Sequence, residues 1–251
     1  MRHPAAVQIL SEATHRLEQA ILALEPDEGH PHGGTMFLFN HLLPPTGTGE
    51  PVDRVVTFLV TSAEAASGGL GRLTMARHMV DAPDAAEVLL FRDWSEQWLR
   101  PTDPNADVAV LPFAHLDNHA ARKGWNWTTQ EVTDGMLLKP ADRVAVLPGE
   151  LAVYGYEPSQ LGSAAQRPSV RPVGIESLPN GSVGVVGAPA SFTGAPVIAL
   201  AELPDGYARF VVAGLVGSST HADPAAPRPM VPASLIRTAA AQVADRLLGP
   251  E

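Results

Sequence analysis

The stretch that decides the fold is Thr193-Gly194-Ala195-Pro196-Val197-Ile198-Ala199-Leu200-Ala201. Gly194 is a typical turn residue, and the apolar run that follows at residues 196–201 contains β-branched side chains, as a buried β-strand does. Runs of the same kind recur on both sides of it, bounded by glycine, proline, aspartate or asparagine. They lie at residues 35–43, 55–61, 87–91, 107–113, 143–147, 151–156, 182–186 and 208–216.

Most of these runs follow one another without a helical crossover. Parallel neighbours would each need a connection of about a dozen residues or more. The sequence therefore predicts an all-β body of antiparallel strands, arranged as a sandwich or a barrel.

Helical periodicity is confined to the two ends of the chain. Apolar residues three and four apart mark one face between Val7 and Leu24 and another between Leu235 and Leu247. We expect an N-terminal helix that ends before Pro26 and a C-terminal helix over residues 232–248, both packed on the body; a helix that docks a partner is the alternative. Residues 44–53 and the proline-rich residues 221–232 are predicted to be mobile loops.

Composition excludes several classes of function. The 251 residues contain 17 Lys and Arg against 27 Asp and Glu, a formal charge of −10, and no basic run, so nucleic acid is not an expected partner. Cysteine is absent, which excludes disulfides, a thiolate nucleophile and a thiolate zinc site, and fits a reducing compartment. No window is apolar enough for a membrane span, and charged residues interrupt residues 1–25, unlike a signal peptide, so we expect a cytoplasmic protein.

Three blocks resemble those of bacterial trypsin-like serine peptidases. The first pairs Gly34-Thr35-Met36-Phe37 with Leu59-Val60-Thr61-Ser62-Ala63-Glu64; in that family the second strand ends in Ala-Ala-His, whose histidine is the general base. The second is Asp107-Val108-Ala109-Val110-Leu111, similar to the strand with the orienting aspartate. The third is Ser191-Phe192-Thr193-Gly194-Ala195-Pro196-Val197, similar to Gly-Asp-Ser-Gly-Gly-Pro-Val around the nucleophile. Glu64 and Asp107 are 43 residues apart, and Asp107 and Thr193 are 86 apart, both close to the family's spacing.

The resemblance spans about residues 33–240 and implies a fold and a site. The expected fold is all-β, with two six-stranded antiparallel barrels, a terminal helix at each end and an active-site cleft between the barrels. The implied divisions are an N-terminal helix in residues 1–28, one barrel in 29–125, and a second barrel with the C-terminal helix in 126–251. By position, Glu64, Asp107 and Thr193 form the triad, and Ser191 and Thr193 provide the oxyanion-hole N–H groups.

The residues at these positions depart from the chemistry that the family requires. Imidazole accepts and returns a proton near neutrality, whereas Glu64 would place a second anion beside Asp107. Thr193 keeps a hydroxyl but adds a methyl group that stiffens its side chain, and Ser191 stands where the family has glycine. We therefore expect a pseudoprotease that binds a protein or peptide and has no cofactor or metal. The alternative is a divergent, active serine- or threonine-type endopeptidase with Thr193 as nucleophile.

Other candidate residues are less specific. A displaced histidine could serve as the base; the candidates are His30, His32, His41, His78, His115, His119 and His221, none of them in the matching turn. His30 and His32 form a His-x-His pair without a third metal ligand at a diagnostic spacing. Trp94 and Trp98 are predicted to share one helical or turn surface, and Trp125 and Trp127 one face of a short extended segment; packing is favoured over ligand binding for all four. A third hypothesis makes the barrels a scaffold whose terminal helices assemble with a partner.

Overall fold

The seven strands of the first sheet come from residues 21–133. The computed structural model describes residues 4–25, 33–44, 54–67, 70–74, 79–81, 88–140, 142, 146–157, 167–202, 208–219 and 226–249. The strands of this sheet are β1 (Ile21–Leu24), β2 (Gly34–Leu42), β3 (Val55–Thr61), β4 (Leu70–Thr74), β6 (Val88–Arg92), β7 (Ala109–Pro112) and β9 (Val132–Thr133). Their order is β6-β4-β1-β2-β3-β7, antiparallel throughout, with β9 added to β2 in parallel. Leu99, which follows β6 and the short helix α2 (Trp94–Gln97), bridges to Val110 of β7, so the sheet curls.

The second sheet has seven strands, and its two end strands are consecutive in the chain. It contains β10 (Val146–Gly155), β11 (Ser169–Pro172), β12 (Gly174–Ser177), β13 (Val183–Val186), β14 (Pro196–Glu202), β15 (Ala208–Val216) and β16 (Arg228–Pro232). The order is β11-β10-β14-β15-β16-β13-β12, and all pairs are antiparallel. Only Val173 separates β11 from β12, the two ends of this order, so a nearly continuous strand closes the sheet on itself. A small ribbon pairs β5 (Val80–Asp81) with β8 (Asn126–Trp127).

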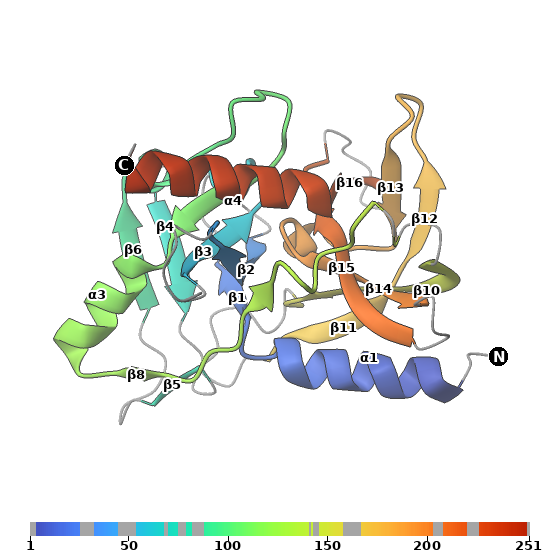
Figure 1. Ribbon diagram of the computed structural model, residues 1–251, viewed down its shortest axis with the longest axis horizontal. Coiled ribbons are helices and arrows are strands. Elements are labelled where there is room, and N and C mark those ends of the chain that lie inside the picture. The colour runs from blue at the N-terminus through green and yellow to red at the C-terminus, as the bar shows by residue number, and fades with distance from the viewer. Residues whose placement is uncertain are drawn as a thin grey trace.

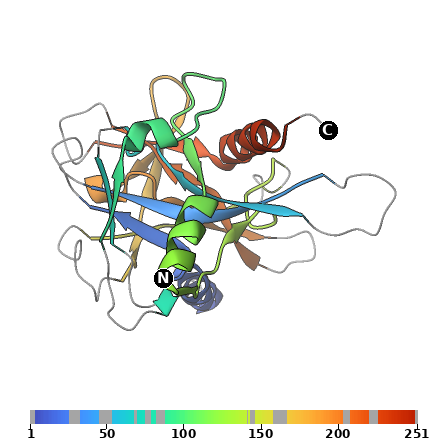
Figure 2. The ribbon, with the colours of Figure 1, turned by 90° about the vertical axis from the view of Figure 1, so that its left-hand side faces the viewer.

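Three longer helices lie on the outside of the sheets. They are α1 (Pro4–Leu17), α3 (Ala114–Lys123) and α4 (Ala233–Leu248). Helix α4 crosses over both sheets, contacting β2, β3 and β7 as well as β15 and β16 (Figure 1). Figure 2 shows α3 in front of the first sheet, at the end of the molecule away from β12 and β13.

The core has one part shared by the sheets and one part inside each sheet. The shared cluster includes Leu17 of α1, Phe39 of β2, Ile198 of β14 and Val243 of α4, all fully buried. Residues of α4 at helical spacing, Ile236, Ala239, Ala240, Val243 and Ala244, face inward, so its apolar stripe packs within the chain. The same holds for Ala13 and Leu17 of α1.

The tryptophans pack within or against the first sheet, as the sequence favoured. Trp94 and Trp98 are buried with ring centroids 5.1 Å apart, and Trp94 donates its indole N–H to the carbonyl of Ala65 at 3.2 Å. A Cβ on Gly71 would lie 2.2 Å from the Trp94 ring, so this strand position requires glycine. Trp125 and Trp127 are half-buried against the same core, and Asn126–Trp127 is extended.

All nine predicted strand runs overlap strands, but three other predictions need correction. Residues 146–147 of the run at 143–147 and residues 151–155 of the next run belong to one strand, β10, with a register shift between Val146 and Leu151, while residues 143–145 lie outside the described part. The N-terminal helix ends at Leu17, because the buried run Ile21–Leu24 forms β1; a short apolar run has no period that separates helix from strand. Residues 228–232, expected in a loop, form β16, while residues 45–53 and 220–225 lie outside the described part.

The topology agrees with two curled antiparallel sheets followed by a C-terminal helix. Strands of the first sheet come from residues 21–133 and those of the second from residues 146–232. The division at residues 28 and 125 stays a prediction. Among the described residues, no helix has both the length and the apolar character that a membrane crossing requires.

Candidate active site

Glu64, Asp107 and Thr193 stand at strand ends that the two sheets bring to one region. Glu64 is exposed in the turn after β3, and Asp107 is half-buried just before β7. Because β3 and β7 are antiparallel, with Thr61 opposite Ala109, the end of β3 lies beside the start of β7. Thr193 follows the short 3₁₀ helix η3 (Ala190–Phe192) and precedes β14.

The Asp107 carboxylate joins the two sheets through backbone donors. Its Oδ1 accepts the N–H of Ala63 at 2.8 Å, and its Oδ2 accepts the N–H of Ser218, which follows β15, at 2.5 Å. Hydrogen bonds to an ionised acceptor are short and about twice as strong as neutral ones. Asp107 therefore holds the turn that carries Glu64 against the second sheet. The Ser218 hydroxyl is buried beside it without a partner among the described residues.

The hydroxyl of Thr193 is held by structural hydrogen bonds. Thr193 is only 6% exposed, and its Oγ1 donates to the carbonyl of Ala190 at 2.8 Å. The same oxygen accepts a hydrogen bond from Nη1 of Arg228 at 3.1 Å. A guanidinium has donors and no acceptor. The proton of the hydroxyl thus points at a carbonyl, and the neighbouring side chain cannot accept it.

Arg228 is buried at the start of β16, where its guanidinium also donates through Nε to the carbonyl of Ala188 at 3.3 Å. The side chain is 8% exposed. Burial lowers the pKa of Arg228, and the negative charge of Glu64 opposes that shift. The direct contact of Arg228 with the expected site is its hydrogen bond to Oγ1 of Thr193.

The backbone around Ser191 is folded inward. The N–H of Thr193 closes the turn of η3 on the carbonyl of Ala190 at 3.0 Å. Ser191 is 1% exposed; its hydroxyl donates to the carbonyl of Tyr156 at 2.9 Å and its carbonyl accepts from the hydroxyl of Thr35 at 3.0 Å. An oxyanion hole needs N–H groups aimed at the substrate oxygen. In this conformation the Thr193 N–H already has an internal acceptor.

The loop that carries Thr193 is fixed against the first sheet by Gly194. This glycine has φ of 86°, which side chains rarely adopt. A Cβ there would lie 2.1 Å from both the carbonyl oxygen of Thr35 and Oγ1 of Thr61. The N–H of Thr35 also donates to the carbonyl of Thr193 at 2.8 Å. The Gly34-Thr35 and Thr193-Gly194 segments are therefore in contact.

Two of the described candidate histidines, His41 and His119, lie in other interactions. His41 places Nδ1 3.1 Å from Oδ2 of Asp134, and the ring of His119 contacts that of Trp125. His115 is exposed on α3. His30, His32, His78 and His221 are outside the described residues, and so is the His-x-His pair. Within the described ranges, no three histidine, aspartate or glutamate side chains are grouped so that they could hold a metal ion.

Sequence reasoning missed Arg228 and Ser218. Arg228 lies in Pro227-Arg228-Pro229, and the prolines there indicated a loop rather than a strand with a buried side chain. A useful signal was available in Met230-Val231-Pro232, whose apolar residues precede the C-terminal helix. Ser218 follows the strand-forming run at residues 208–216, but nothing in its own sequence context indicated a bond to Asp107.

Comparisons with known proteins concern the fold alone. No protein-family model and no curated protein sequence matches the chain. Among solved structures, the scabies mite inactivated protease paralogue S-D1 is 11% identical, with 92% of this chain and 93% of that chain covered and a TM-score of 0.47. The Drosophila Grass clip serine protease of the Toll pathway is 12% identical, with 94% and 70% covered and a TM-score of 0.47. The serine endoprotease from Yersinia pestis is 13% identical, with 95% and 66% covered and a TM-score of 0.40.

Two curled antiparallel sheets follow one another along the sequence, the three expected triad positions lie next to the ends of β3, β7 and β14, and α4 contacts strands of both sheets. This topology is the one that the resemblance to trypsin-like serine peptidases predicted: two curled antiparallel sheets followed by a C-terminal helix.

Proposed function

We propose that the protein is a non-catalytic homologue of the trypsin-like serine proteases that binds a protein or peptide as a regulatory module. The observation that carries this proposal is the hydrogen bonding of Thr193. Its hydroxyl proton goes to the carbonyl of Ala190, and its oxygen receives a hydrogen bond from Arg228. A nucleophile of this class needs a base that takes the same proton.

The groups around Thr193 supply no replacement for imidazole. Arg228 stays protonated and can only donate, so it cannot take the proton of the Thr193 hydroxyl. Asp107 accepts two backbone N–H groups and holds the Glu64 turn in place instead of orienting a base. In a well-studied hydrolase, loss of the nucleophile or the base alone lowers kcat by about 10⁶-fold. We assign Glu64, Asp107 and Thr193 to a degenerate triad, and Ser191 and Thr193 to an oxyanion hole that does not form.

We also propose a reducing compartment for the protein and a division of the chain into three segments. The absence of cysteine from the 251 residues fits a reducing environment such as the cytoplasm. We divide the chain into an N-terminal segment at residues 1–28, a first barrel at 29–125 and a second barrel with the C-terminal helix at 126–251. The buried stripes of α1 and α4 favour helices that stabilise the body over helices that assemble with a partner.

Hydrolysis of an activated ester tests the proposal. The wild-type protein and the Thr193→Ala variant should hydrolyse p-nitrophenyl acetate at the same low rate, because the hydroxyl takes no part. The Glu64→His variant serves as a comparison in which an imidazole returns to the turn. Wild-type hydrolysis that exceeds the Thr193→Ala rate and saturates with substrate would establish the active, divergent endopeptidase instead.

A further inference from the structure

The connection between β12 and β13 contains the sequence Asn180-Gly181, at the tip of a hairpin that extends from the second sheet (Figure 1). The N–H of Gly181 donates to the carbonyl of Leu178 at 2.9 Å, and Gly181 has φ of 79°. With Pro179 after Leu178, this pattern is typical of a type I β-turn followed by a left-handed glycine. Asn180 therefore lies at the outer end of the hairpin, where its side chain is exposed.

The side-chain amide of Asn180 is polarised by two donors from one residue. Its Oδ1 accepts the backbone N–H of Ser182 at 3.0 Å and the hydroxyl of Ser182 at 2.6 Å. Asparagine side chains in turns commonly bond to the backbone two residues on. Donors aimed at a carbonyl oxygen also stabilise the negative charge that develops there when a nucleophile adds to its carbon. Ser182 therefore makes Cγ of Asn180 more electrophilic.

A nucleophile is present in the next residue, because the backbone nitrogen of Gly181 can close a ring with Cγ of Asn180. Among the described residues, apart from the chain neighbours, no heavy atom lies within 4 Å of the position of a Cβ on Gly181, and the residue is exposed. Glycine itself places no side chain in the way of ring closure. The rotation that brings the nitrogen to Cγ breaks the hydrogen bond to Leu178. A single exposed hydrogen bond at a hairpin tip opens at small cost.

We propose that Asn180 is a site of spontaneous deamidation through its own backbone, and that Ser182 assists the reaction. The nitrogen of Gly181 forms a bond to Cγ of Asn180. The bond from Cγ to Nδ2 breaks, and Nδ2 leaves as ammonia with the proton that Gly181 has lost. Water then opens the cyclic imide at either carbonyl, which leaves aspartate or isoaspartate at position 180. The product carries an additional negative charge at the hairpin tip, and the site is independent of whether Thr193 is catalytic.

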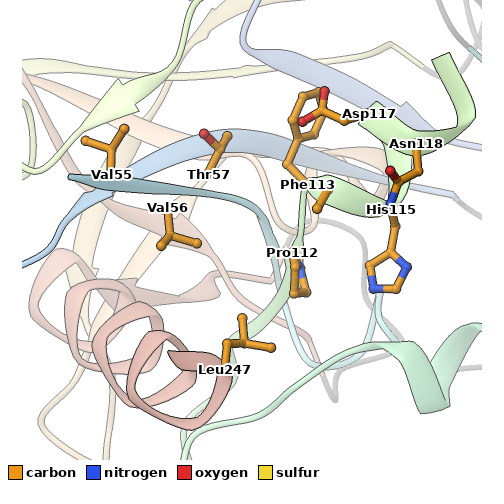
Figure 3. Close-up of a pocket in the computed structure, with 10 residues that line it drawn as sticks. Val55, Val56, Thr57, Pro112, Phe113, His115, Asp117, Asn118 and Leu247 are labelled. Atoms are coloured by element: carbon orange, nitrogen blue, oxygen red, sulfur yellow. The ribbon is translucent and has the colours of Figure 1, made fainter. Parts of the chain in front are cut away.

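Three other exposed asparagines lack one or more of these features. Asn105 is in a loop, but the next residue, Ala106, has a Cβ and is only 6% exposed. Asn118 lines a groove of about 530 Å³ between α3, β3, β7 and α4 (Figure 3), and the helix α3 fixes its backbone. Asn126 is paired in β8 and is followed by Trp127. These asparagines are controls within the same molecule.

Incubation of the purified protein at pH 6 and at pH 8, followed by peptide mapping, tests the proposal. Cleavage after glutamate gives residues 177–202, which contain Asn180, and residues 97–131, which contain the three control asparagines. Deamidation replaces NH₂ by OH, so the mass of fragment 177–202 should rise with time. The rise should be faster at pH 8, because the attacking nitrogen must lose its proton. Fragment 97–131 should react at least about 10-fold more slowly, because a Cβ or a fixed backbone hinders each attack.

Two variants and a free peptide separate the reaction from the fold. Asn180→Gln should abolish the mass change, since its longer side chain must form a larger ring. Ser182→Ala should slow the reaction about 3-fold or more, since it removes one of the two donors to Oδ1. The folded protein should react within about 10-fold of the rate of N-acetyl-Leu-Pro-Asn-Gly-Ser-amide, because one hydrogen bond must open. An unchanged mass of fragment 177–202, equal rates in the two fragments, a folded protein much slower than the peptide, or a Ser182→Ala variant as fast as the wild type would each overturn the proposal.

Discussion

Replacing Arg228 with alanine should destabilise the fold, because it removes a buried cation that binds two acceptors. The guanidinium donates to Oγ1 of Thr193 and to the carbonyl of Ala188. A hydrogen bond from a charged group contributes about 1.5–3 kcal/mol, and the bond to Ala188 is long at 3.3 Å. The substitution also removes the free-energy cost of burying the charge, and this offsets part of the lost hydrogen-bond energy. We expect the free energy of unfolding to fall by about 2–4 kcal/mol.

Urea denaturation at pH 7, followed by circular dichroism, measures this change. The matched control is Arg171→Ala, whose side chain is 43% exposed and pairs with Glu157 at 2.7 Å. An exposed ion pair contributes little, so the control should lose less than about 1 kcal/mol. A double-mutant cycle with Thr193→Val should give a coupling energy of about 1–2 kcal/mol between positions 193 and 228.

Two results would refute the reasoning on Arg228. If Arg228→Ala unfolds at the same urea concentration as the wild type, the guanidinium does not stabilise the loop of Thr193. If the single changes are additive, the hydrogen bond between Arg228 and Thr193 has no energetic weight. The hydroxyl would then lack the restraint on which the proposed inactivity depends.

Three further predictions concern the surrounding framework. Burial is the largest single influence on Asp134 and raises its pKa, but the hydrogen bonds of the carboxylate together lower the pKa below the usual 3.8. The contribution of Asp134 to the free energy of unfolding is therefore present above pH 3.8 and is lost as the pH falls below it. Asp134→Asn should therefore cost about 1–3 kcal/mol at pH 7 by urea denaturation, with a deficit that shrinks as the pH falls below 3.8; a constant deficit would contradict this. Asp107→Ala should cost about 2–4 kcal/mol because two backbone N–H groups lose their acceptor, and an unchanged melting temperature would argue against that role. Gly194→Ala should fail to accumulate as folded protein, since its Cβ would clash at 2.1 Å with Thr35 and Thr61; a wild-type spectrum would show that this loop can move.

The strands were predictable where apolar runs are long and bounded by turn residues. The runs at 55–61, 196–201 and 208–216 all form strands within about one residue of the expected limits. The short pairings were not predictable, because strands such as Val132–Thr133 exist only through their neighbours in the sheet. Burial of Ile21–Leu24 between β2 and β4 likewise depends on contacts far along the chain.

The position of the candidate site stays a prediction, and its contacts could not be predicted from the sequence. The order of the three blocks located Glu64, Asp107 and Thr193, and the structure brings their strand ends together. Spacing could not show that Arg228 reaches Thr193, since 35 residues separate them. The prolines on either side of Arg228 indicate the conformation of the backbone, and they do not indicate where the arginine side chain is buried. The partner of a buried hydroxyl is a property of the tertiary fold.

Reaction with a fluorophosphonate, followed by intact-mass spectrometry, tests the inactivity of Thr193 most directly. The wild-type protein, Thr193→Ala and Glu64→His are incubated with the reagent at pH 8 and their masses compared. Because the Thr193 hydroxyl donates to Ala190 and accepts from Arg228, the wild type should carry no adduct, like Thr193→Ala. An adduct on the wild type that is absent from Thr193→Ala would show an activated nucleophile and contradict the proposed function.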